Sequence, residues 1–81
     1  MVLGMPIVFK IGSYEFRFYS SDATEPIHVH VWSNGKKAKF WLAPIRLVDA
    51  HGLSKKDLSA IRKILTAHEQ EIIKKWQERF P

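Results

Sequence analysis

The sequence predicts an α+β fold, in which an antiparallel meander of four or five strands is packed on one face by a long C-terminal helix. Apolar and polar side chains alternate through the first half of the chain, as is typical of half-buried strands. An Asn34-Gly35 dipeptide joins two such segments, and an apolar stripe with helical spacing follows. With 81 residues, the chain is expected to form a single domain over 1–81, with its strands within 7–48 and its helix at 54–80.

The first two strands are expected at Ile7–Ile11 and Tyr14–Ser20, separated by a turn at Gly12-Ser13. The second strand alternates strictly, so its side chains divide between two faces. One face carries Tyr14, Phe16 and Phe18, and the other carries Glu15, Arg17 and Tyr19. Residues Ser21–Pro26 are polar and end in proline, which predicts a loop before the third strand.

The third and fourth strands form a hairpin, Ile27–Leu42, around Asn34-Gly35. Both residues of this turn tolerate a positive φ, and a two-residue turn fixes the register of the strands. Ser33 should therefore pair with Lys36, and this pair sets all the other residue pairs farther from the turn. One face is apolar and is predicted to lie in the core: Ile27, Val29, Val31, Ala38, Phe40 and Leu42. The opposite face is predicted to be uncovered: His28, His30, Trp32, Lys37, Lys39 and Trp41.

After Pro44, a short edge strand is expected at Ile45–Val48, followed by a turn at Asp49–Leu53. Ser54 and Asp57 resemble a capping box at the start of the helix. The helix would be about 40 Å long, whereas the sheet would be only about 15–20 Å wide. We therefore expect the helix to overhang the sheet, to break, or to pack on something else. An overhang would expose an apolar surface for a protein partner or a second copy of the chain, and its residues would be Ile73, Trp76 and Phe80.

The composition narrows the classes of function. The chain has no cysteine, which excludes disulfides and thiolate metal sites, and no segment is long and apolar enough for a membrane span. The net charge is +5, and it is uneven. Residues 36–81 hold eleven Lys and Arg against five Asp and Glu, whereas residues 1–35 hold two against three. A basic protein of this size favours nucleic acid, an anionic surface or an acidic protein as its partner.

His28 and His30 lie two residues apart on one strand, so both imidazoles point the same way. Two such rings can chelate zinc or a similar metal, with Glu25 or His51 as a further ligand. His-x-His is a short motif, however, and no third ligand lies at a spacing that is typical of a metal-binding motif. The sequence therefore predicts no metal site and no cofactor.

Two other functions fit the same face. In a metal-independent ribonuclease, His28 and His30 would act as acid and base, while Lys39 would stabilise charge on the phosphate. In a binding module, lysines and aromatic rings would contact nucleic acid or anchor a protein partner. The candidate binding residues are Arg17, Tyr19, Trp32, Lys37 and Trp41. A third alternative is purely structural, with His28 and Trp41 packed as a cross-strand pair.

Three segments carry a resemblance to a known family. They are EPIHVHV (Glu25–Val31), AKFWLAP (Ala38–Pro44), and the terminal Lys75-Trp76 with Phe80. Together with the Gly-Leu-Ser before the helix, they resemble a small prokaryotic family, domain of unknown function 4160. The resemblance covers nearly the whole chain. Ile27 stands where the family usually has a proline, and Gln77 stands where many members have a histidine.

Members of this family are often encoded beside another small protein, in arrangements similar to toxin–antitoxin pairs. The resemblance thus implies a cytoplasmic bacterial protein with a small protein partner, and it carries over His28, His30, Lys39, Trp41 and Trp76. The function that we predict is an interaction module of such a pair that binds a small partner protein, with RNA as a further candidate ligand. The alternative is a metal-independent ribonuclease toxin that uses His28 and His30.

Overall fold

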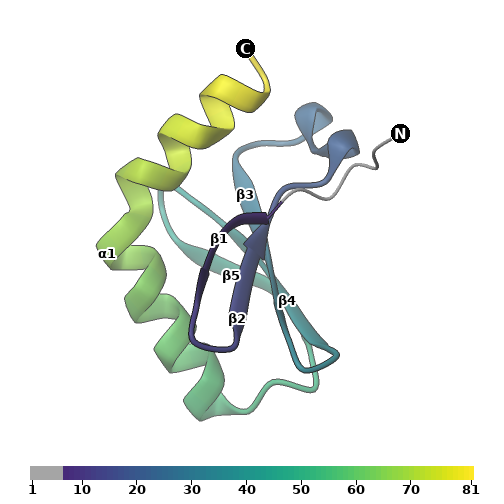
Figure 1. Ribbon diagram of the computed structural model, residues 1–81, viewed down its shortest axis with the longest axis vertical. Helices are drawn as coiled ribbons and strands as arrows, with labels where there is room; N and C mark the ends of the chain where they lie inside the picture. Colours follow the sequence, from purple (N-terminus) through teal and green to yellow (C-terminus); the bar gives the residue numbers. More distant parts are fainter. Residues whose placement is uncertain (1–6) are drawn as a thin grey trace.

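The computed structural model describes residues 7–81 and has five antiparallel strands followed by one helix. The strands are β1 (Ile7–Ile11), β2 (Tyr14–Arg17), β3 (His28–Ser33), β4 (Lys36–Trp41) and β5 (Arg46–His51), and they lie in the sheet in sequence order. The helix α1 (Lys55–Arg79) runs along one side of the sheet (Figure 1). The predicted α+β fold is confirmed. None of the helices in this described part of the chain combines the length and apolar content needed to cross a bilayer.

The β3–β4 hairpin has the predicted register. Asn34 and Gly35 adopt φ values of 51° and 77°, which a two-residue turn of this kind requires. Six residue pairs follow, from Ser33 opposite Lys36 to His28 opposite Trp41. The Leu42 N–H donates to the Ile27 carbonyl at 3.1 Å, so the pairing continues one step further. The division of the hairpin into an apolar and a polar face therefore stands.

Other boundaries differ from the prediction. β2 ends at Arg17 instead of Ser20, and a 3₁₀ helix, η1 (Ser20–Thr24), replaces the start of the expected polar loop. The chain turns there because the Asp22 N–H donates to the Tyr19 carbonyl at 3.0 Å. β5 continues to His51, past the expected end of the strands at residue 48, because β4 supplies ladder partners as far as Lys37.

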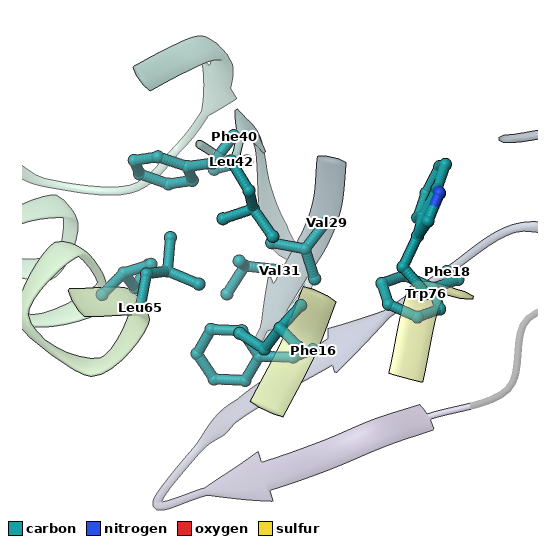
Figure 2. Close-up of a cluster of buried hydrophobic side chains, with 11 residues drawn as sticks. Phe16, Phe18, Val29, Val31, Phe40, Leu42, Leu65 and Trp76 are labelled. Atoms are coloured by element: carbon teal, nitrogen blue, oxygen red, sulfur yellow. The ribbon is translucent and has the colours of Figure 1, made fainter. Parts of the chain in front are cut away.

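The core lies between the sheet and α1, and its centre is fully buried (Figure 2). Phe16, Val29, Val31 and Phe40 come from the sheet and have no exposed surface. Facing them, the apolar stripe of the helix contributes side chains that are equally buried: Ile61, Leu65 and Ile72. The alternation along the strands and the three- to four-residue spacing along the helix therefore meet in a single hydrophobic cluster.

The helix is continuous and does not expose the apolar patch that we expected from an overhang. Trp76 is only 7% exposed and packs edge-on against Phe18, with ring centroids 5.3 Å apart. Phe80 packs on the Trp76 ring, and Ile73 is partly buried against the core. Sheet width alone underestimated the surface available to the helix, because Phe18 and its neighbours continue the apolar face beyond the end of β2.

The core predicts a large effect for one substitution on the helix. Leu65→Ala should lower the free energy of unfolding by about 2–5 kcal/mol, because it leaves a cavity between helix and sheet. Lys63→Ala, two residues away on the exposed side of the same helix, should change it by less than about 0.5 kcal/mol. Urea unfolding followed by circular dichroism measures both, and equal effects would contradict the burial of Leu65.

The start of α1 depends on ionised Asp57. The Ser54 hydroxyl accepts a hydrogen bond from the Asp57 N–H at 3.1 Å, and the Asp57 carboxylate accepts one from the Ser54 N–H at 3.1 Å. The Tyr14 hydroxyl also donates to Asp57, at 2.9 Å, which ties β2 to the helix. The bonds that the carboxylate accepts, first from the Ser54 backbone and then from the Tyr14 hydroxyl, lower the pKa of Asp57 below 3.8.

A lowered carboxyl pKa stabilises the folded state above the unfolded pKa, and this contribution is lost as the pH falls through the folded value. Asp57→Asn keeps an accepting oxygen but removes the charge. Wild type should therefore be more stable than Asp57→Asn at pH 7, and the difference should shrink below about pH 3.8. Urea unfolding of both proteins across this range measures the difference, and a gap that is independent of pH would contradict the explanation.

Candidate functional site

The candidate site lies on the sheet face opposite the core. We call this surface the polar sheet face; it comprises His28, His30 and Trp32 of β3, Lys37, Lys39 and Trp41 of β4, and the neighbouring Arg17 and Tyr19. Arg17 pairs with His30 across β2 and β3, as the predicted alternation requires. All five candidate binding residues therefore belong to one surface.

His28 is fully buried, so the expectation that both imidazoles face solvent is wrong for this ring. Trp41 covers it from β4 and Trp76 covers it from α1, with ring centroids 5.6 Å and 5.2 Å away. η1 and the C-terminal end of α1 lie at the same end of the molecule, near the start of β3 (Figure 1). This end of the polar sheet face is closed, whereas the end near the hairpin turn is open.

One hydrogen bond fixes the tautomer of the His28 ring. Its Nδ1 lies 2.9 Å from the Pro26 carbonyl oxygen, which can only accept, so Nδ1 carries a proton. In the neutral ring, Nε2 then bears a lone pair. That atom lies 3.0 Å from Oδ1 of Asp22 and 3.6 Å from Oε1 of Glu25. Despite the short distance, Nε2 has no aligned hydrogen-bond partner among the described residues.

His30 lies beside this ring and faces the same carboxylate. Its Nε2 is 3.2 Å from Oδ1 of Asp22, and the Tyr19 ring stacks on it with centroids 3.8 Å apart and planes within 3°. Burial lowers the pKa of His30 below 6.5, and the hydrogen bond and the charge of Asp22 only partly offset this effect. The neutral imidazole is therefore the favoured form.

Asp22 joins the two histidines, and our reading of the sequence missed it. It is 5% exposed, and its Oδ2 accepts the Tyr19 N–H at 2.7 Å, which leaves Oδ1 facing both rings. One ligand atom from each of Asp22, His28 and His30 lies within 4.8 Å of the others, and we call these residues the histidine cluster. An aspartate three residues after Tyr19, able to reach back to its N–H, was the available signal. The expected third residues, Glu25 and His51, are not members.

Lys39, which the sequence suggested for stabilising charge on a phosphate, forms an ion pair with Glu25. Its Nζ donates to Oε1 of Glu25 at 2.7 Å and lies 4.9 Å from the centre of the Trp41 ring. This hydrogen bond is the main cause that lowers the pKa of Glu25, and the positive charge of Lys39 lowers it further by a smaller amount. Lys39 and Glu25 thus form an ion pair at the edge of the histidine cluster.

Trp32 stands between two hollows on the open end of the polar sheet face. One hollow measures about 350 Å³ and is lined by Lys10, Ser13, Glu15, Arg17, Trp32, Ser33, Asn34 and Gly35. The other measures about 170 Å³ and is lined by Tyr19, His30, Trp32, Lys37, Ala38, Lys39, Asp49 and His51. Both hollows mix cations with carboxylates. Arg17 pairs with Glu15, and His51 lies 2.9 Å from Asp49.

A family model matches residues 13–77, under the description domain of unknown function (DUF4160). The chain belongs to this family. The match covers the hairpin, η1 and most of α1, so it includes the polar sheet face and the histidine cluster. Searches of curated proteins and of solved structures return no match.

Trp32 and Tyr19 hold each other in place within this DUF4160 chain. The indole N–H of Trp32 donates to the Tyr19 hydroxyl at 3.0 Å, and Lys37 Nζ lies 5.3 Å from the centre of the indole. Tyr19→Phe removes this acceptor and keeps the ring on His30. It should lower the free energy of unfolding by about 0.5–1.5 kcal/mol. Urea unfolding measures the loss, and an unchanged free energy of unfolding in Tyr19→Phe would contradict the role of the bond.

Proposed function

We propose that this DUF4160 protein is an interaction module that binds a small protein partner through the open end of the polar sheet face. The observation that supports the proposal is the setting of Trp32. It is a half-buried aromatic ring between two hollows whose walls carry both signs of charge. Tryptophan, tyrosine and arginine are the residues that most often anchor protein interfaces. A polar rim of mixed charge around such an anchor selects a partner by complementary charges.

The partner that we propose is the small protein encoded beside this one, in a pair similar to a toxin and its antitoxin in the bacterial cytoplasm. The resemblance of the sequence to this one family, whose members are often encoded beside such a small protein, supports this part. The mixed charge of the face supports a protein over RNA, because Glu15 and Asp49 would face the phosphates of a bound strand. RNA is the second candidate, supported by the excess of lysine and arginine in residues 36–81.

The burial of His28 argues against the ribonuclease alternative. Acid–base catalysis needs a group within hydrogen-bond reach of the reacting proton. The His28 ring has no exposed surface, and its Nδ1 is held by the Pro26 carbonyl. His30 points its Nε2 at Asp22, and Lys39 is bound to Glu25. Each of the three candidate catalytic groups therefore contacts another residue of the same chain and is not directed toward a substrate.

Co-expression with the neighbouring protein tests the proposal. Lys37 is exposed beside Trp32, and Lys63 is exposed on α1, so Lys37→Glu and Lys63→Glu make the same charge change on different surfaces. The wild-type chain and Lys63→Glu should co-purify with the neighbour. Lys37→Glu should weaken the complex by at least about tenfold, because it reverses a charge at the rim of the anchor.

Three results would contradict this function. The wild type could fail to bind its neighbour at micromolar concentration, Lys63→Glu could be the variant that loses binding, or the complex could be insensitive to Lys37→Glu and to Trp32→Ala together. Salt-sensitive binding of a single-stranded RNA oligonucleotide that is lost in Lys37→Glu, in the absence of binding to the neighbour, would favour the second candidate instead.

A further inference from the structure

We propose that the histidine cluster, Asp22, His28 and His30, binds one divalent metal ion of the zinc class. The ligand atoms would be Oδ1 of Asp22 and the Nε2 atoms of both histidines. Two imidazoles and one carboxylate suit zinc and the neighbouring transition metals. This inference does not depend on the proposed function, because neither Trp32 nor Lys37 is a proposed ligand; His30 is the member of the cluster that also lines a hollow beside Trp32.

The spacing of the ligand atoms suits a single ion. A zinc ion binds nitrogen and oxygen at about 2.0–2.2 Å, so two of its ligands lie about 3.0–3.5 Å apart. The two distances to Oδ1 of Asp22 are 3.0 Å from His28 and 3.2 Å from His30. The remaining pair lies within 4.8 Å. Metal binding would require the His30 ring to turn in the plane of its stack with Tyr19, and its proton to move from Nε2 to Nδ1, so that both Nε2 atoms face a common ion.

The second observation is the state of His28. Its Nδ1 donates to the Pro26 carbonyl, so in the neutral ring the Nε2 lone pair faces a carboxylate oxygen at 3.0 Å. Two lone pairs at this distance repel unless a cation lies between them. A backbone carbonyl that holds the second nitrogen of a histidine is also the usual outer support of a metal ligand. The buried nitrogen thus has the tautomer and the support that a metal ligand needs.

The direction of this nitrogen favours a metal over a shared proton. A proton between the two groups would lie near the line from Nε2 to Oδ1 and would give an aligned hydrogen bond. Nε2 of His28 has no such alignment with any described partner. Ligands of one metal point toward a common third point and not at each other. The off-axis approach of His28 to Asp22 is therefore expected of two ligands of the same ion.

The surroundings of the cluster hold the donors in place and supply further negative charge. The Tyr19 N–H fixes Oδ2 of Asp22, and the Tyr19 ring fixes His30 by stacking. Glu25 lies 3.6 Å from His28 Nε2 and is bound to Lys39. The nearby positive charge of Lys39 is thus balanced by Glu25 instead of opposing the ion directly.

Zinc binding by protein purified without a histidine tag tests the proposal. After dialysis against a slight excess of Zn²⁺, elemental analysis should find about one zinc per wild-type chain, with an increase in melting temperature on addition of Zn²⁺. Co²⁺ bound at the same site should show visible absorption bands, as expected of cobalt held by ligands in a low-symmetry arrangement. Asp22→Asn and His30→Gln should each weaken zinc affinity by at least about tenfold.

His51→Ala is the matched control, because His51 forms an exposed pair with Asp49 at 2.9 Å, close in length to the contact of His28 with Asp22. This variant should bind zinc like the wild type. A folded wild type that takes up no zinc would overturn the proposal, as would affinity that is unchanged in His30→Gln. Loss of binding in His51→Ala alone would assign the metal to the surface pair and would equally overturn it. If Asp22→Asn fails to fold, His30→Gln alone decides, since the His30 side chain is 14% exposed whereas Asp22 is 5% exposed.

Discussion

The two-residue turn at Asn34-Gly35 is the constraint on which the rest of this structure depends. It sets the register of β3 against β4, and a shift of one residue would move every side chain of a strand to the opposite face. With the observed register, Val29, Val31 and Phe40 meet α1, while His28 and His30 lie together on the other face. The core and the candidate site are therefore two consequences of the same pairing.

The closed end of the polar sheet face combines buried polar groups with aromatic rings. Burial of a carboxylate without partners costs several kcal/mol, so Asp22 persists at 5% exposure only because its surroundings compensate. The Tyr19 N–H satisfies one of its oxygens, and the two imidazoles face the other. Trp41 and Trp76 then exclude water from His28. The carboxylate of Asp22 is thus held by one backbone donor and two imidazoles in surroundings that exclude water.

Local sequence signals were sufficient for most of the fold. The positive φ of Asn34 and Gly35, the alternation along β3 and β4, and the capping residues Ser54 and Asp57 act over a few residues, so they can be read without knowledge of the tertiary structure. The fold class and the membership of the polar sheet face followed from them. The end of β5 did not, because its last residues are held by pairing with Lys37 and not by their own pattern.

The candidate site was harder to predict, because its closure depends on contacts between distant residues. Asp22 lies in a polar segment that resembles an exposed loop, and only the 3₁₀ turn of η1 brings it over β3. Trp76 was assigned to an overhang from the length of α1, yet it reaches Phe18 and His28. Whether a histidine is exposed cannot be read from its own strand when one of the residues that cover it, here Trp76, is more than forty positions away.

The most direct measurement of this arrangement is the state of the His28 ring in solution, by long-range ¹H–¹⁵N NMR. The account predicts a slowly exchanging proton on Nδ1, held by the Pro26 carbonyl, and nuclear Overhauser effects from the ring to the indoles of Trp41 and Trp76. A ring without a proton on Nδ1, or one that exchanges rapidly and shows no contact to either indole, would contradict it.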